Sequence, residues 1–293
     1  MIDYYETKSQ PITKVMVWQA FKEVRANKGS AGIDKMSWEY LDKNLTTELY
    51  KLWNRLTSGS YFPNACQTSC HHQRKVEEIR KLGIPTILDR IAQQVVKRHL
   101  ERIVEPLFHE SSFGYRPNRN CHQAIQQANV NVFNHDFAID LDIKGFFDNI
   151  DHELLMKAVT HYCKDKWVLL YVARWLKSGV IQQDGSFFAT QSGTPQGGVI
   201  SPLLANLFLH VVFDKWMEKH HPEKPFERYA DDIVVHCKTE KQALYLLHLI
   251  HKRMESCKLT VHPEKSKIVN LRGISIKKYP KGFDFLGFTI RPH

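Results

Sequence analysis

The chain has 293 residues, about two domains at roughly 150 residues each, and is long enough to bury a sizeable core. Hydrophobic residues make up 43% and charged residues 25%, a composition that excludes a disordered chain. The 41 Lys and Arg exceed the 31 Asp and Glu and give a net charge of +10. This excess favours a polyanionic partner such as nucleic acid, although a generally basic surface without a specific ligand would explain it equally well.

No apolar run approaches the roughly 18–20 residues that span a bilayer, and the first ten residues do not resemble a secretion signal. The six cysteines are scattered along the chain, which fits reduced thiols. We therefore expect a cytoplasmic protein without membrane contact. Cys66 and Cys70 precede His71 and His72 like half of a zinc site, but no second Cys/His pair follows at finger-like spacing.

The first third of the chain is mostly helical and basic in its predicted structure. Leucines at steps of three and four predict one amphipathic helix over residues 38–57. Other predicted helices cover residues 14–27, 86–104 and 118–134. Together these segments form a helical N-terminal part that ends near residue 135.

The remainder mixes helices with strands that carry acidic residues. Residues 137–143 alternate apolar and acidic side chains and predict a strand. Residues 229–237 predict a β-hairpin with an acidic turn, and residues 283–290 a closing strand. Helices are expected over 152–178, from Ser201-Pro202 onward, and over 240–257. The pattern indicates an α+β chain.

Acidic residues at two strand ends are candidates for a metal site. Asp140 and Asp142 share one strand face, and Gly145 follows in a turn where backbone amides could approach a phosphate. Asp231 and Asp232 lie in the expected hairpin turn, where Mg²⁺ would stabilise two neighbouring carboxylates. Each pattern taken alone also fits an ordinary solvated turn.

Two further segments are candidates for ligand contact. The loop 192–198 has three glycines, which permit close backbone approach, and Gln196, which could contact a base edge or a sugar. The basic stretch 71–81 could neutralise a triphosphate or a template backbone. A plain glycine-rich loop and a solvated charged hairpin are the alternatives.

The order of these elements resembles the reverse transcriptases encoded by bacterial and organellar group II introns, also called maturases. The resemblance is carried by LGIPTILDRIAQQ (82–94), SSFGYRPNRNCHQAI (111–125), LDIKGFFDNIDH (141–152), SGTPQGGVISPLLANLFLH (192–210), RYADD (228–232), HPEKSKIV (262–269) and FLGF (285–288). It covers nearly the whole chain from Trp18 onward.

The resemblance implies the fingers and palm of a right-hand polymerase, with an antiparallel palm sheet backed by helices. Residues 1–135 would form the fingers with an N-terminal helical extension, and 136–293 the palm, with 160–200 contributing to the fingers. A thumb or maturase region is expected to be missing. An isolated core of this kind is expected to copy RNA weakly, because nothing beyond the palm would hold the duplex.

The resemblance also implies site residues. Asp142, Asp231 and Asp232 match the catalytic aspartates that hold two Mg²⁺ ions, for which Mn²⁺ could substitute. Other matches are Lys265 as proton donor to pyrophosphate, Phe147 as the gate against a 2′-hydroxyl, Gly145 and Phe146 as amide donors to the triphosphate, Gln196 beside nucleotide and template, and Arg80 and Arg74 as phosphate contacts. Arg74 stands where the family more often has lysine, in a turn that departs from the family pattern.

The resemblance implies a bacterial protein rather than an organellar one. The implied partners are an RNA template with a DNA primer, dNTPs and intron RNA, with a homodimer possible. A second reading is an RNA-binding splicing cofactor in which polymerisation is secondary. Basic residues of the N-terminal helices would then grip structured RNA by its shape and phosphates: Arg25, Lys28, Lys35, Lys43, Lys51 and Arg55. A third reading, an RNA-copying RNA polymerase, conflicts with the bulky Phe147.

Overall fold

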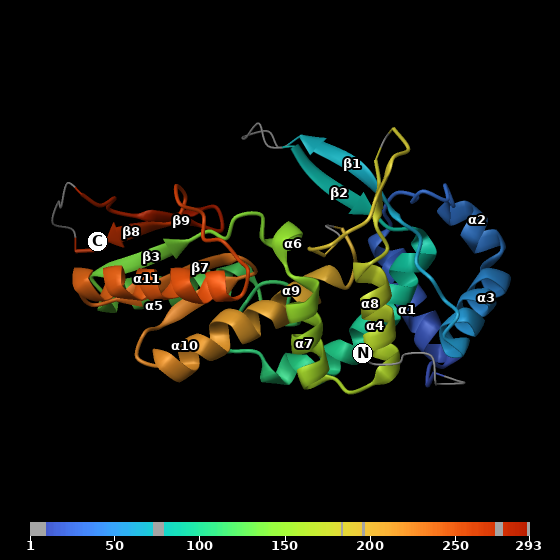
Figure 1. Ribbon diagram of the computed structural model, residues 1–293, viewed down its shortest axis with the longest axis horizontal. Coiled ribbons are helices and arrows are strands. Elements are labelled where there is room, and N and C mark those ends of the chain that lie inside the picture. The colour runs from blue at the N-terminus through green and yellow to red at the C-terminus, as the bar shows by residue number, and fades with distance from the viewer. Residues whose placement is uncertain (1–9, 73–78, 183, 195–196, 273–277, 292–293) are drawn as a thin grey trace. The chain divides into compact units, whose positions relative to one another are not determined.

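The computed structural model describes residues 10–72, 79–182, 184–194, 197–272 and 278–291 (Figure 1). The side chains of residues 67–82 lie outside this description. The chain forms two compact units, each discontinuous in sequence. Unit 1 comprises residues 1–106 and 152–204, and unit 2 comprises residues 107–151 and 205–293. No helix in the described part of the chain is long and apolar enough to cross a membrane.

Unit 1 is a helical body with a small sheet. Its helices are α1 (Lys14–Asn27), α2 (Trp38–Lys43), α3 (Leu45–Ser58), α4 (Ile87–Val104), α7 (His152–Tyr162) and α8 (Lys166–Leu176). Helix α4 is followed by the short 3₁₀ turn η1 (Glu105–Leu107). Helix α4 contacts α1, α3 and α8, and its apolar residues, such as Ile91 and Val96, are fully buried. The predicted helices 14–27 and 86–104 are therefore confirmed.

Two long predicted helices are each interrupted. The helix expected over 38–57 divides at Asn44, whose backbone leaves the helical region and whose side-chain amide donates to the Tyr40 carbonyl at 2.9 Å. The helix expected over 152–178 ends at Tyr162 and restarts after Asp165, which has an extended backbone. Asp165 lies 2.7 Å from Nε2 of His99 in α4, a contact distant in sequence. The leucine pattern alone contains neither break.

The sheet of unit 1 has the strand order β2-β1-β4-β5. Strands β1 (Cys66–His72) and β2 (Ile79–Ile84) are antiparallel, β4 (Val180–Ile181) is parallel to β1, and β5 (Phe187–Phe188) completes it. Cys66 is buried, and burial raises the pKa of its thiol to about 12. Cys70, His71 and His72 have side chains outside the description.

Unit 2 is built on an antiparallel four-stranded sheet in the order β6-β7-β3-β8 (Figure 1). The strands are β3 (Phe137–Leu141), β6 (Phe226–Tyr229), β7 (Asp232–Cys237) and β8 (Lys267–Asn270). Both neighbours of the central strand β3 pair with it in the antiparallel sense. The strand predicted over 137–143 and the hairpin predicted over 229–237 are confirmed.

Helices α5 (Cys121–Asn134) and α11 (Glu240–Ser256) pack against this sheet. Ala124 and Ala128 of α5 share a buried cluster with Ala138 of β3 and Val234 of β7. The helix predicted over 118–134 begins at Cys121, because the Asn120 side chain caps it and accepts from the Gln123 amide at 3.1 Å. The α+β class with an antiparallel sheet backed by helices is therefore confirmed.

Two other segments differ from the expected pattern. The single strand expected over 283–290 is a hairpin, β9 (Phe283–Phe285) with β10 (Phe288–Ile290), because Leu286 and Gly287 both have positive φ and turn the chain. The helix expected from Ser201 begins there as α9 (Ser201–Leu209). It continues through a π-helical turn, η2 (His210–Asp214), into α10 (Lys215–His220).

Candidate active site

Strand register relates the positions of Asp142 and Asp232 in unit 2. The last pair in the β3–β7 ladder joins Leu141 to Ile233. Continued by one residue on each strand, this register would place Asp142 opposite Asp232, and residues that are opposite each other share a sheet face. Asp142 is half-buried and Asp232 is exposed, so this end of the sheet presents carboxylate oxygens to solvent.

Asp231 occupies the two-residue turn between β6 and β7. Tyr229 pairs with Asp232, which leaves Ala230 and Asp231 as the turn residues. Ala230 has φ 56°, in the left-handed region that non-glycine residues seldom adopt. A Cβ on Gly114 would lie 2.5 Å from the Ala230 nitrogen, so only glycine lets the 111–114 backbone lie against this turn.

The backbone of Asp142 is held by the segment that carries Lys265. The Asp142 amide donates to Ser266 Oγ at 3.0 Å, and the His262 amide donates to the Asp142 carbonyl at 2.8 Å. The Lys265 amide donates to His262 Nδ1 at 3.3 Å, and its side chain is exposed. Lys265, the predicted proton donor, therefore lies on a segment that is hydrogen-bonded to the backbone of Asp142.

Asp140 lies two residues before Asp142 on the same strand face. It is opposite Lys267 of β8, with Nζ at 3.5 Å from Oδ2. The pKa of Asp140 is raised to about 6, mainly by burial, which outweighs the lowering by Lys267; the charge of Asp142 adds to the rise. The ion pair accounts for Asp140 without a role as a metal ligand.

Gly145 to Phe147 turn the chain immediately after β3. Gly145 has φ 55° and precedes the short helix α6 (Phe146–Asn149). The Asn149 side-chain amide donates to the carbonyls of Lys144 and Gly145 at 3.0 and 3.1 Å and closes the turn. Phe146 is buried and anchors the segment, whereas Phe147 is half-buried, with the two rings 5.4 Å apart. Phe147 thus retains an accessible ring close in sequence to Asp142.

The remaining predicted ligand contacts belong to unit 1. Arg80 lies in β2 opposite His71, and its side chain is outside the description. Arg74 and Gln196 lie outside the described residues. In the glycine-rich loop, Gly197 has φ 102°, and a Cβ there would lie 2.4 Å from the Gly83 oxygen of β2. The loop therefore packs directly on the strand that carries Arg80.

The carboxylates fit a metal that takes part of its coordination from substrate. Within the described ranges, no group of three or more His, Cys, Asp or Glu side chains is gathered closely enough to hold a metal ion alone. Asp142, Asp231 and Asp232 nevertheless supply oxygen donors at one strand end. Hard divalent cations such as Mg²⁺ are typically bound by one or two carboxylates together with water and substrate phosphates.

Sequence reasoning assigned no role to three buried residues beside the acidic turn. Arg228 lies within the quoted RYADD motif, and it contacts Asp214 and Asn206, which are also buried. Asp214 ends the apolar run LFLHVVFD, and an acid at that place is the one signal that could have indicated it.

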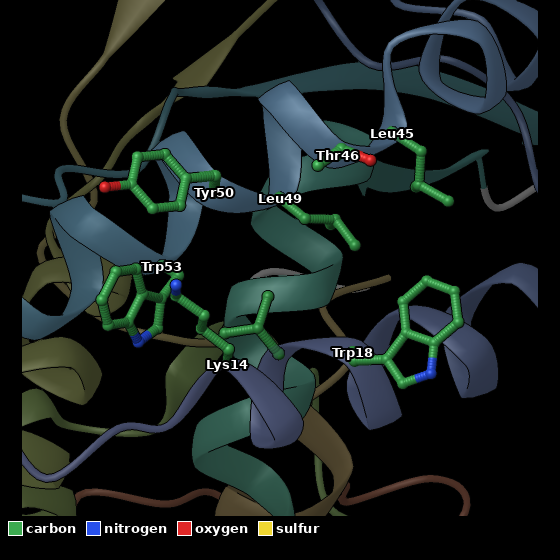
Figure 2. A pocket seen from close by; sticks show the side chains of 8 residues that line it. Lys14, Trp18, Leu45, Thr46, Leu49, Tyr50 and Trp53 are labelled. Carbon is green, nitrogen blue, oxygen red and sulfur yellow. The ribbon is translucent and has the colours of Figure 1, made fainter.

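Unit 1 also has a hollow of about 360 Å³ between α1 and α3 (Figure 2). Figure 2 shows Trp18 on one side of it and Tyr50 with Trp53 on the other. Lys14 Nζ lies 5.1 Å from the Tyr50 ring centroid and 4.7 Å from that of Trp53. Trp18 is 45% exposed, an unusual degree for a large aromatic side chain. The other lining residues are Val17, Leu45, Thr46 and Leu49.

Acidic residues at a strand end and in the facing hairpin turn of an antiparallel sheet are typical of nucleic-acid polymerases that use metal ions. The family described as "Reverse transcriptase (RNA-dependent DNA polymerase)" matches residues 71–290. The chain belongs to this reverse transcriptase family.

Individual relatives agree with this assignment. Group II intron-encoded protein LtrA of Lactococcus lactis is 32% identical over 72% of this chain and 36% of its own length. Protein YkfC of Escherichia coli is 29% identical over 88% of this chain and 75% of its own. Telomerase from Candida albicans, solved with a fragment of telomeric RNA, shares the fold with a TM-score of 0.61. It is 13% identical over 79% of this chain and 44% of its own. The chain thus spans about a third of LtrA.

Proposed function

We propose that the chain is the catalytic core of an RNA-directed DNA polymerase of the group II intron type. It adds dNTPs to the 3′-hydroxyl of a primer paired with an RNA template. The single observation that carries this proposal is the strand register that, continued by one pair, would place Asp142 opposite Asp232, with Asp231 in the adjoining turn. Family membership over residues 71–290 supports the same activity.

The reaction joins the primer 3′-oxygen to the α-phosphorus of the nucleotide and breaks the bond to the oxygen that bridges to the β-phosphorus. Two Mg²⁺ ions, for which Mn²⁺ could substitute, would stabilise the attacking and leaving oxygens when bound. Asp142, Asp231 and Asp232 would hold them through carboxylate oxygens. Lys265 is exposed and lies on the segment that is hydrogen-bonded to the Asp142 backbone. It would donate a proton to the departing pyrophosphate.

Other residues would bind the nucleotide and select its sugar. In this proposal the amides of Gly145 and Phe146 meet the triphosphate, and the half-buried ring of Phe147 blocks a 2′-hydroxyl. Arg80 and Arg74 offset phosphate charge, and Gln196 contacts nucleotide and template. In domain terms, residues 1–135 and 160–200 would act as fingers and the rest of 136–293 as palm.

The proposed partners are an RNA template with its primer, dNTPs and intron RNA, and the proposal allows a homodimer. The proposed compartment is the bacterial cytoplasm. It is supported by the free thiols of Cys66, Cys121, Cys163, Cys237 and Cys257.

Primer extension tests the polymerase proposal. A labelled DNA primer annealed to RNA should be extended with dNTPs and Mg²⁺, and the product should survive alkali as DNA. The Asp142→Asn variant is the control for a contaminating enzyme. A chain that binds the primer–template but extends it no faster than this variant would contradict the proposal.

A second candidate function, recognition of structured RNA by the N-terminal helices, is favoured by the aromatic hollow of Figure 2. Unpaired bases stack on exposed aromatic rings, and Lys14 lies where it could meet the adjoining phosphate. Of the six basic residues proposed for this role, Arg25 is paired with Asp42 and Lys51 with Glu48. The aromatic rings of the hollow would therefore supply base stacking, which the charges of these basic residues cannot supply.

Replacing Trp18 by Ala should weaken binding of structured RNA about tenfold, because one stacked base is worth about 1–3 kcal/mol. Filter binding with intron RNA measures the change. Tyr245→Ala is the matched control, because Tyr245 is an exposed aromatic residue on α11 of unit 2. Equal affinities of the two variants would contradict RNA binding at the hollow.

A further inference from the structure

A buried ion pair lies behind the acidic turn of unit 2. Arg228 of β6 and Asp214 of the π-helical turn are both fully buried. Arg228 Nε donates to Asp214 Oδ1 at 2.7 Å, and Nη2 donates to Oδ2 at 2.6 Å, so the contact is bidentate. Burial alone would raise the pKa of Asp214, but the charge and hydrogen bonds of Arg228 hold it below its ordinary value. The bidentate contact with Arg228 thus favours the carboxylate form of Asp214.

The Nη1 group of the same Arg228 guanidinium contacts the turn itself. Arg228 Nη1 donates to the Ala230 carbonyl at 3.1 Å and to Asn206 Oδ1 at 2.9 Å. Asn206 in turn donates its side-chain amide to the Gly114 carbonyl at 2.6 Å. The Gly114 backbone is the surface against which the Ala230 nitrogen packs. The turn is thus held on two sides by one connected set of buried polar groups.

The π-helical turn explains how Asp214 comes to face the sheet. In a continuous α-helix each residue is rotated by about 100° around the helix axis from the residue before it. A π-helical turn changes this rotation, so the residues that follow it face a different direction than in an uninterrupted α-helix. His210 to Asp214 form such a turn between α9 and α10, and its last residue is the carboxylate that binds Arg228. Insertions of this kind occur frequently at functional sites.

The turn needs external support because its backbone is unfavourable for alanine. Ala230 at φ 56° costs about 1–2 kcal/mol relative to an ordinary conformation, and such residues persist where their surroundings fix them. The residue that follows is Asp231. A shift of the Ala230 carbonyl would therefore move the carboxylate that the proposed reaction needs.

We propose that Arg228, Asp214 and Asn206 are positioning residues that fix the Ala230–Asp231 turn and thereby set the positions of the Asp231 and Asp232 carboxylates. The role in catalysis rests on the proposed polymerase function, whereas the control of the turn does not. None of the three residues contacts substrate in this proposal. They act through the Ala230 carbonyl and the Gly114 backbone.

Hydrogen–deuterium exchange of the turn tests this role without metal or nucleotide. In Arg228→Lys and Asp214→Asn, the amides of residues 229–233 should exchange about tenfold faster than in the native chain, because local opening becomes easier. Asn206→Ala removes fewer contacts and should also speed amide exchange at residues 229–233. It tests the proposal in the case in which the first two variants do not fold.

Glu227→Gln is the matched control. Glu227 is adjacent in β6 and fully buried, but it pairs with His236 at 2.7 Å and also accepts from Asn131. It should lower the melting temperature without speeding exchange at residues 229–233. If Glu227→Gln speeds this exchange as much as Asp214→Asn, the ion pair merely stabilises the sheet and the proposal is overturned.

A second readout links the turn to the carboxylates. Mn²⁺ titration followed by electron paramagnetic resonance should show about tenfold weaker binding in Arg228→Lys and Asp214→Asn and unchanged binding in Glu227→Gln. In primer extension the same two variants should lower kcat more than they raise KM for dNTP. A native chain that adds no nucleotide would refute the polymerase function, while the exchange result would still decide the positioning role.

Discussion

Phe147 is the residue to which the proposed function assigns selection of the nucleotide sugar. Its neighbour Phe146 is buried, and the turn at Gly145 is closed by Asn149, so the position of the Phe147 ring is set by local contacts. The proposed function assigns this half-buried ring the exclusion of a 2′-hydroxyl. That role can be tested with a single side-chain substitution.

Replacing Phe147 by Val should raise ribonucleotide incorporation at least about tenfold, because removal of a steric clash of about 1.4 kcal/mol gives that factor. Primer extension with mixed dNTPs and rNTPs measures the preference. Phe146→Leu should keep the native sugar preference, since its proposed contact is a backbone amide. An unchanged preference in Phe147→Val would remove the gate assignment.

At this scale the sequence indicates the candidate acidic residues but not the buried residues behind the turn. Long motifs and strand alternation indicate Asp142, Asp231 and Asp232, and the β3–β7 register ends one pair before Asp142 and Asp232. Arg228 and Asp214 are 14 residues apart in sequence. Their pairing depends on a π-helical turn that no periodicity reveals.

Among the elements, periodicity predicts helices better than it predicts their interruptions. Helices α1 and α4 end where the pattern indicates, but Asn44 and Asp165 divide longer predicted helices through polar contacts. The hairpin at Leu286 and Gly287 was likewise predicted as one strand, because FDFLGFTI is rich in apolar and aromatic residues on both sides of the turn. Local hydrogen bonds and positive φ angles override the hydrophobic pattern in each case.

The glycine-rich loop provides a test at the scale of an element. Gly197→Ala should destabilise unit 1 and reduce nucleotide addition, because its Cβ would lie 2.4 Å from the Gly83 oxygen and its φ is 102°. We expect a loss of at least about 1–2 kcal/mol, combining backbone strain with the clash. Thermal unfolding and primer extension measure the two effects.

Gly185→Ala is the control for backbone strain alone. Gly185 has φ 85°, but nothing lies within 4 Å of the Cβ that alanine would add. It should cost less stability than Gly197→Ala and leave nucleotide addition unchanged. Equal effects of the two substitutions would show that the close approach of the loop to β2 is unimportant.

For the whole molecule, each of the two compact units is built from two separate segments of the chain. Leu107–Asp151 belongs with the residues after 205, and His152–Leu204 belongs with the N-terminal part. A boundary near residue 135 follows from composition, but composition cannot show which distant segments pack together. The assignment of these units to fingers and palm remains part of the proposed function.

The proposed RNA binding should depend on salt, because the chain carries a net charge of +10. With about six phosphate contacts, the affinity should fall by about 10³-fold between about 50 and 200 mM salt, because released counterions drive binding. Filter binding at several salt concentrations gives the slope of log affinity against log salt concentration. Arg55→Gln should make this slope less steep by about the amount expected for one phosphate contact. A flat response would contradict a basic RNA-binding surface.

The central claim is that Asp142, Asp231 and Asp232 act together as metal-binding carboxylates. The most direct measurement compares primer extension and RNA affinity in Asp231→Asn and in Asp148→Asn, an exposed acid outside the proposed set. The account predicts that Asp231→Asn lowers nucleotide addition by at least about 10³-fold, as loss of a group that stabilises transition-state charge does, with RNA affinity kept. Asp148→Asn should stay near native activity. Nucleotide addition that survives in Asp231→Asn, or RNA affinity that falls with it, would contradict the account.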